Sequence, residues 1–104
     1  MKRHQLTLAP MVVDHIRTQV FHIAQDSIDP ALAWEDRLLT AIKNLADFSG
    51  YAVDEEASAR LGYPLYRLVF ERTYLVHFTI DKAAGVIRIV NFRHGSRLPK
   101  AGEP

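Results

Sequence analysis

The chain has 104 residues, of which 48% are apolar and 24% charged, ordinary values for a soluble globular protein. This length predicts a single domain over residues 1–104 with a core of its own. The absence of cysteine excludes disulfides, thiolate metal sites and thiol catalysis. No apolar run approaches the roughly 18 residues of a membrane helix, and the basic start MKRHQLTLAP lacks the apolar stretch of a signal peptide. We therefore expect a cytoplasmic protein without membrane contact.

The net charge of +1 hides a difference between the two halves of the chain. Residues 1–57 contain five Lys or Arg and nine Asp or Glu, a net charge of −4. Residues 58–104 contain eight Lys or Arg and three Asp or Glu, a net charge of +5. A basic half can attract an acidic partner or a phosphate backbone, but this charge is too small to identify nucleic acid as the ligand.

The first elements are a short strand and an amphipathic helix. Residues 4–8, HQLTL, alternate apolar and polar side chains and predict the strand. Pro10 suits the first turn of a helix. From Met11 to about Ala24, apolar residues recur at spacings of three and four, which indicates a helix with one apolar face.

A second helix is predicted from Asp29 and Pro30, with Asp29 capping the exposed N–H groups and Pro30 at the first helical position. Gly50 is expected just past its end as a left-handed stop. Two helices joined by a few residues should be antiparallel neighbours. The apolar face of the second helix comprises Leu32, Leu38, Leu39, Ile42, Leu45 and Phe48.

The second half of the chain changes to a period of two. Residues 51–63 are polar and irregular and predict a linker loop with room for one helical turn. Alternating segments at 66–71, 74–80 and 86–92 predict three strands, the last two joined by a hairpin loop with Gly85 at positive φ. Short turns favour an antiparallel meander, whose apolar face should cover the helical hairpin. We therefore predict an α+β fold: a short N-terminal strand, an antiparallel helical hairpin, then a three-stranded antiparallel meander.

Arginines on the late strands form the sharpest group of candidate functional residues. Neither a Gly-rich phosphate loop nor a metal-ligand spacing appears among the scattered histidines, so no cofactor and no metal are predicted. Arginine offers a planar fork of donors that matches phosphate or carboxylate oxygens. The group predicts an anion-binding or target-binding surface, although exposed strand arginines also serve as a solvated sheet edge. Its members are Arg67, Arg72, Arg88, Arg93 and Arg97.

His94 lies within this group, and histidine is the side chain whose ordinary pKa is closest to neutral pH. A neutral imidazole there could act as an acid or base, whereas the simpler interpretation is a surface histidine at a strand end. His77 alternates with Val76 and Phe78, which places it on the outer side of its strand. Trp34 is expected to pack between the hairpin and the sheet, and the strand aromatics follow core periodicity rather than that of a base-stacking surface.

Three segments carry a resemblance to a known family. "VIRIVNFRHGSR" (86–97) resembles the closing strand of ParE-like proteins, where an apolar strand runs into a His-Gly step followed by arginine. "DPALAWEDRLLTAIKNLADFSG" (29–50) looks like the second helix, and "LYRLVFERTYLVHFTID" (65–81) like the two middle strands, of the RelE/ParE superfamily of type II toxin–antitoxin toxins. The resemblance covers residues 4–97.

The resemblance implies a small bacterial toxin that a cognate antitoxin neutralises. RelE-like members cleave mRNA on the ribosome, and ParE-like members act on DNA gyrase. RelE-like toxins usually place an arginine after an aromatic residue early in the third strand, where this chain has Leu75 after Tyr74. They often carry a tyrosine near the chain end, where this chain has His94 or Gly95. These departures favour the ParE-like branch.

The sequence therefore predicts a ParE-like toxin that inhibits DNA gyrase, with Arg67, Arg72, Arg88, Arg93 and Arg97 contacting the target or the antitoxin. Two alternatives stay open. The chain is either a ribosome-dependent endoribonuclease using His94 as catalytic acid or base, or a toxin-fold module that binds a partner and harms nothing. Whether it is an enzyme and whether it forms a homodimer also stay open.

Overall fold

The computed structural model describes residues 4–47 and 52–95. Along the chain these form eight elements: β1 (Gln5–Leu8), α1 (Pro10–Ala24), α2 (Ile28–Asn44), β2 (Ala52–Val53), α3 (Glu55–Leu61), β3 (Tyr66–Phe70), β4 (Tyr74–Asp81) and β5 (Val86–His94).

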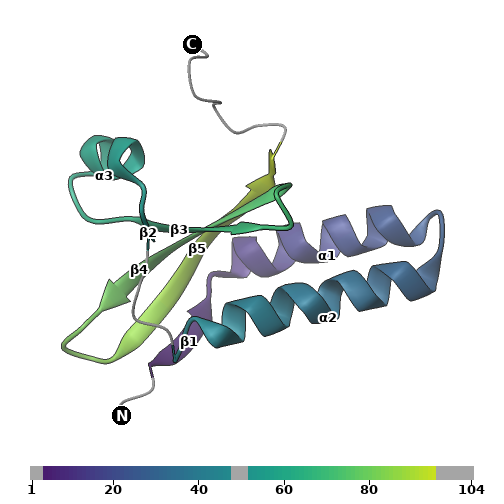
Figure 1. Ribbon diagram of the computed structural model, residues 1–104, viewed down its shortest axis with the longest axis horizontal. Helices are drawn as coiled ribbons and strands as arrows, with labels where there is room; N and C mark the ends of the chain where they lie inside the picture. The colour runs from purple at the N-terminus through teal and green to yellow at the C-terminus, as the bar shows by residue number, and fades with distance from the viewer. Residues whose placement is uncertain (1–3, 48–51, 96–104) are drawn as a thin grey trace.

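The strands form one mixed sheet in the order β1-β5-β4-β3-β2 (Figure 1). The neighbours from β2 to β5 pair antiparallel, which confirms the meander of the last three strands. β1 pairs parallel with the first half of β5, from Gln5 opposite Val86 to Leu8 opposite Ile89. The helical hairpin connects β1 at one edge of the sheet to β2 at the other edge, and the antiparallel strands then lead back to β5 beside β1.

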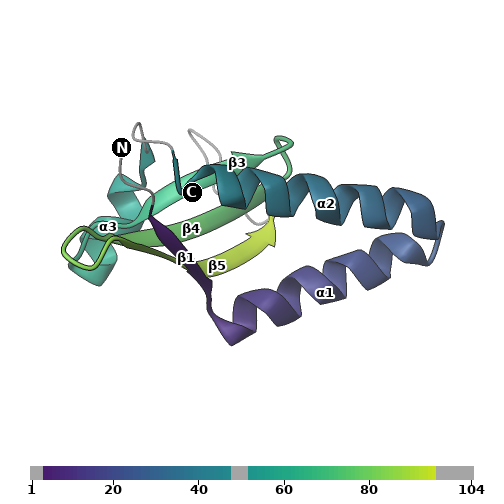
Figure 2. The ribbon, with the colours of Figure 1, turned by 90° about the horizontal axis from the view of Figure 1, so that it is seen from below.

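The two long helices lie on one face of the sheet, and α3 lies on the other (Figures 1 and 2). Trp34 of α2 is 4% exposed and meets the rings of Phe70, Tyr74 and Phe92 edge-on at centroid distances of 5.1–6.2 Å, which confirms its place between hairpin and sheet. We call the face that carries α1 and α2 the inner face and the opposite one the outer face. Within the described ranges, none of the helices has the length and apolarity needed to span a bilayer.

The start of α2 differs from the prediction. The helix begins at Ile28 after Ser27, so Asp29 lies in the first turn and is not the N-cap. There its carboxylate interacts favourably with the positive end of the helix dipole. Pro30 occupies a position whose N–H would have no intrahelical partner. The helix ends at Asn44, and the predicted stop at Gly50 lies outside the described residues, as does Phe48.

The segment predicted as a linker loop contains an edge strand and a helix of seven residues. β2 pairs with β3 through Ala52 and Val53. α3 begins at Asp54, whose side chain accepts a hydrogen bond from the Ala57 N–H at 3.0 Å. It ends at Gly62, which has a φ of +81°. These capping signals are present in the sequence, and only the polarity of the segment favoured a loop.

The turns of the meander differ in their chemistry. Gly85 has the expected positive φ, +68°, in the β4–β5 loop. The β3–β4 turn instead places Glu71 and Arg72 at φ +53° and +58°. Left-handed backbone at such residues costs of order 1–3 kcal/mol each. The ion pair from Arg37 Nε to Glu71 Oε2, 2.6 Å long, ties this turn to α2.

Candidate functional site

A β-bulge in β5 decides which side chains share a face of the sheet. His77 pairs with Asn91 and the next residue of β4, Phe78, pairs with Ile89, so Val90 is an extra residue in β5. A bulge reverses the alternation beyond it. Asn91 and Arg93 therefore lie on the outer face together with Arg88. Phe92 and His94 turn to the inner face, as their pairing with Val76 and Tyr74 requires.

A row of polar residues crosses the outer face of the sheet. Arg67 of β3 pairs with His77 of β4, and His77 pairs with Asn91 of β5. His77 was expected on this side of its strand, and it is. The residue is nevertheless only 5% exposed. The covering segment is the turn into α3, which brings Asp54 over the imidazole.

Asp54, His77 and Asn91 form a hydrogen-bonded chain. The His77 Nε2 and Asp54 Oδ2 atoms are 2.9 Å apart, and the Asn91 amide nitrogen lies 3.3 Å from His77 Nδ1. With the amide donating to Nδ1, the remaining imidazole proton is on Nε2 and is donated to the carboxylate. The imidazole is thus held by a hydrogen-bond partner on each side.

The carboxylate of Asp54 is held in its charged form. Partial burial works against ionisation, but the Ala57 N–H, the His77 ring and the nearby Arg67 charge outweigh it and lower the pKa of Asp54 below its ordinary value of 3.8. Asp54 therefore has two structural functions. It caps α3, and it fastens the β2–α3 segment to the middle of the sheet.

Three of the predicted arginines border this chain on the outer face. Arg67 and Arg88 are exposed, and the Arg88 guanidinium lies 3.6 Å from the Asp81 carboxylate. Arg93 is half-buried, and its Nε atom is buried without a hydrogen-bond partner among the described residues. On one strand, residues two apart on the same face are roughly 7 Å from each other, so Arg93 and Arg88 flank Asn91 at distances that an extended anionic partner can span.

The other predicted site residues lie elsewhere. Arg72 is exposed at the tip of the β3–β4 turn, and Arg97 lies outside the described residues. His94 is exposed on the inner face at the end of β5, where it meets the Tyr74 ring edge-on at 5.2 Å. The structure thus places Arg67, Arg88 and Arg93 on one face of the sheet and His94 on the other, although His94 and Arg93 both line a pocket at the edge of β5.

Gly95, next to His94, is required by the packing of the β3–β4 turn. A Cβ atom at this position would lie 2.6 Å from the carbonyl carbon of Thr73 and closer still to its oxygen. The backbone at the end of β5 therefore passes directly against the turn. This contact explains the glycine of the His-Gly step by steric necessity.

A small pocket opens beside the second half of β5, beyond the end of β1. Its volume is about 270 Å³. His15 Nδ1 lies 3.4 Å from the Phe92 carbonyl, and Gln19 donates to the Tyr74 hydroxyl at 3.2 Å. Burial and the Glu71 charge raise the pKa of Tyr74, against the effect of the Gln19 hydrogen bond. The lining residues are polar except for one aromatic: His15, Thr18, Gln19, Asn91, Phe92, Arg93 and His94.

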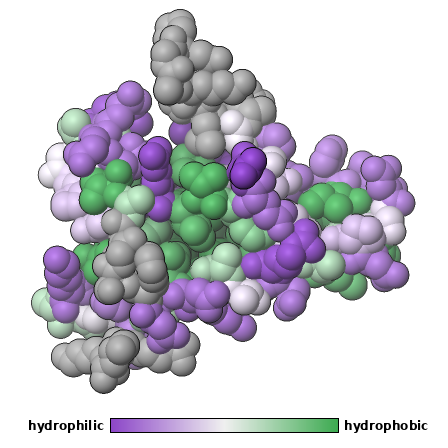
Figure 3. Space-filling model, in the orientation of Figure 1, coloured by the Kyte–Doolittle hydropathy of each residue, from purple (hydrophilic) through white to green (hydrophobic). Residues whose placement is uncertain are grey.

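The surface around the sheet combines apolar and hydrophilic areas. Figure 3 shows apolar side chains gathered over the middle of the molecule, bordered by hydrophilic ones. Val69, on the outer face beside the arginines, is 49% exposed. No three His, Asp or Glu side chains come together as a metal site within the described part of the chain.

Sequence reasoning missed the contribution of Asp54, His77 and Asn91. The alternation of β4 put His77 on the correct face, but the partner that buries it is 23 residues away in a segment predicted as a loop. Asn91 joins the outer face only because of the bulge at Val90, for which the sequence has no signal.

Comparison with known proteins adds no assignment. No family model matches the chain, and no match is found among curated proteins or solved structures.

Proposed function

We propose that this chain is the toxin of a type II toxin–antitoxin system, of the ParE-like branch, and that it inhibits DNA gyrase until a cognate antitoxin neutralises it. The observation that carries the proposal is the closing strand, in which the His94-Gly95 step follows an apolar strand that displays Arg88 and Arg93. Gly95 is sterically fixed at the place where the motif has its glycine.

The order of elements also supports the proposal. A strand, a helical hairpin and a meander of three strands are what the resemblance implies, and these elements are present. The basic half of the chain is expected to attract an acidic partner, and the structure offers a surface that would suit one. Arg67, Arg88 and Arg93 share the outer face with the exposed Val69. An antitoxin segment with apolar and acidic residues would complement both.

The nuclease alternative is less well supported by the geometry. Cleavage through the 2′-oxygen needs an acid or base and a cation at the same phosphate. His94 shares the small pocket beside β5 with Arg93, but it lies on the inner face, away from Arg67 and Arg88. The position after Tyr74, where RelE-like toxins usually have an arginine, is Leu75, which is 3% exposed.

Two assays with the same purified protein test the proposal. We expect inhibited supercoiling by DNA gyrase and intact mRNA in a translation extract. Arg93→Gln should weaken gyrase inhibition, and Lys43→Gln, which removes an exposed charge from α2, is the matched control. Codon-specific mRNA cuts that disappear in His94→Ala would contradict the gyrase assignment and support the ribosome-dependent nuclease. Normal growth on induction, with neither activity, would leave only a binding module.

A genetic observation tests the toxin class separately from its target. We expect a neighbouring short reading frame whose product has a DNA-binding N-terminal part and an acidic tail. Its coexpression should restore growth, and purification should recover both chains as one complex. Failure of that product to bind the chain would contradict the toxin–antitoxin assignment itself.

A further inference from the structure

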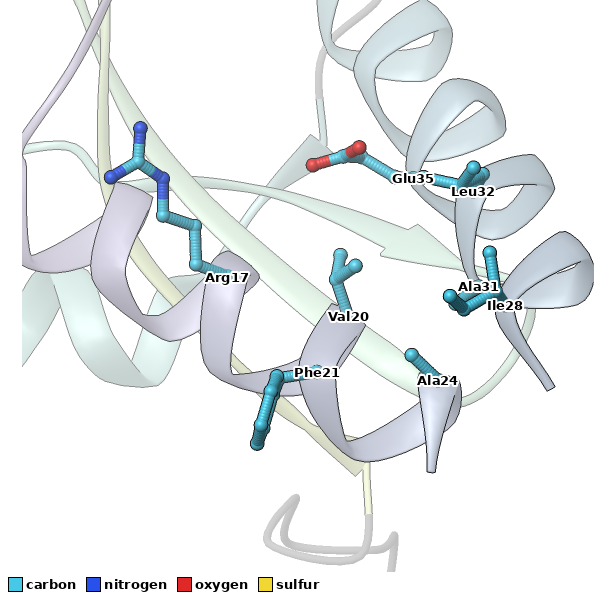
Figure 4. A pocket seen from close by; sticks show the side chains of 8 residues that line it. All are labelled: Arg17, Val20, Phe21, Ala24, Ile28, Ala31, Leu32 and Glu35. Atoms are coloured by element: carbon cyan, nitrogen blue, oxygen red, sulfur yellow. The ribbon is translucent and has the colours of Figure 1, made fainter. Parts of the chain in front are cut away.

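The helical hairpin carries an apolar groove between its two helices, with the buried Ala31 and the partly buried Val20 at its base. Figure 4 shows side chains of both helices lining it. Each helix contributes positions i, i+3, i+4 and i+7, which form one continuous stripe on a helix surface. The lining residues are Arg17, Val20, Phe21 and Ala24 of α1, and Ile28, Ala31, Leu32 and Glu35 of α2.

Large apolar side chains in the groove are exposed to solvent, as in a contact surface without its partner. Phe21, Ile28 and Leu32 are 71%, 62% and 56% exposed, respectively. Figure 3 shows an apolar area over this far part of the hairpin, set among hydrophilic side chains. The hairpin also projects past the sheet in both ribbon views, so a partner can reach the groove without meeting the strands (Figures 1 and 2). Apolar patches rimmed by charge mark protein contact sites.

The charges of the groove identify the partner. Arg17 begins the stripe of α1 and Glu35 ends that of α2, so in an antiparallel hairpin both lie at the same end of the groove (Figure 4). Neither forms a hydrogen bond or ion pair with another described residue. One cation and one anion give the groove no net sign, whereas an acidic partner is better matched by the outer-face arginines.

We propose that this groove is the interface of a homodimer, in which the hairpins of two copies pack face to face. A two-fold axis parallel to the hairpin places α1 of one protomer on α2 of the other. Arg17 then meets Glu35 of the partner subunit, and by symmetry the contact occurs twice. The four helices form an antiparallel bundle around Val20, Phe21, Ile28 and Leu32. A perpendicular axis would instead place both charges against the apolar tip of the other copy, where they would be desolvated without partners.

This inference is independent of the toxin proposal, and sedimentation of the full chain over a concentration series tests it. Because the contact depends on three well-exposed apolar side chains, Phe21, Ile28 and Leu32, we expect reversible dimerisation at micromolar protein. Leu32→Asp should abolish the dimer. Val69→Asp, the same change at a comparably exposed position on the sheet, should leave it intact.

Charge exchange tests the arrangement itself. Arg17→Glu and Glu35→Arg each replace two attractive contacts with two repulsive ones, so each should weaken the dimer about 10-fold. The double variant should restore wild-type association, and an equimolar mixture of the two single variants should form heterodimers. A monomer at every concentration, or a dimer lost in Val69→Asp but kept in Leu32→Asp, would overturn the proposal. If the double variant associates as weakly as the single variants, the parallel two-fold axis is ruled out.

Discussion

Replacement of Asp54 by alanine should destabilise the protein strongly, although the residue is close to the surface. The Asp54 carboxylate caps α3 by accepting from the Ala57 N–H, and it accepts from His77 Nε2 at 2.9 Å. Loss of an N-cap costs about 1 kcal/mol. A buried imidazole N–H left without its acceptor costs about 1–3 kcal/mol more. We therefore expect Asp54→Ala to lower the free energy of unfolding by about 2–4 kcal/mol, a large fraction of the total stability of a domain this size.

Urea denaturation followed by circular dichroism measures this change, with Asp54→Asn as the matched variant. The asparagine oxygen can keep the cap, and its amide can donate to Nε2 if His77 adopts the other tautomer and the Asn91 amide turns over. We expect this variant to lose only about 1 kcal/mol. Replacing both members of the pair, as in Asp54→Ala with His77→Leu, should be no worse than Asp54→Ala alone, because the buried imidazole N–H is then gone and the half-buried Asn91 amide can donate to water. An Asp54→Ala variant within about 0.5 kcal/mol of wild type would refute this account of the hydrogen-bonded chain.

Three further predictions follow from single positions. The pKa of Asp54 is lowered on folding from its ordinary value of 3.8. The ionised carboxylate therefore stabilises the fold fully above pH 3.8, and this stabilisation disappears as the pH falls through the lower pKa of the folded state. In urea titrations at acid pH, the stability difference between wild type and Asp54→Asn should therefore shrink, and a growing difference would contradict a lowered pKa. Gly95→Ala should cost about 1–3 kcal/mol because its methyl group meets the Thr73 carbonyl, whereas Gly85→Ala, in open space at φ +68°, should cost about 1 kcal/mol from backbone strain alone. Equal urea midpoints for these two variants would argue against the steric role of Gly95. Arg72→Gly should raise the melting temperature by relieving a left-handed backbone, worth up to about 1 kcal/mol; a lowered melting temperature would mean that the arginine side chain stabilises the turn.

The helices, the meander and the position of Trp34 could be predicted from the sequence because their signals are local. Spacings of three and four identified α1 and α2, and the change to a period of two identified β3, β4 and β5. The α3 helix was missed although its capping residues Asp54 and Gly62 are present. Its length of seven residues gives too few apolar positions for a period to stand out.

The site could be predicted only in part, because its faces depend on a single inserted residue. The arginines were identified by their place on late strands, and three of them do share a face. Strict alternation along β5 would have put Arg88 and Arg93 on opposite faces and His94 beside Arg88. The bulge at Val90 reverses this assignment, and the burial of His77 depends on a distant carboxylate. Neither effect has a local sequence signal.

The parallel pairing of β1 with β5 has a consequence for how the chain folds. Gln5 and its partner Val86 belong to the first and the last of the described strands. The helical hairpin consists of local contacts and can form early, but closing the sheet must bring together segments about 80 residues apart in the chain, a slow kind of step. Until then Leu6 and Leu8 lack the strand beside which they pack. Formation of β5 is therefore the step that covers the apolar side chains of β1 and completes the sheet.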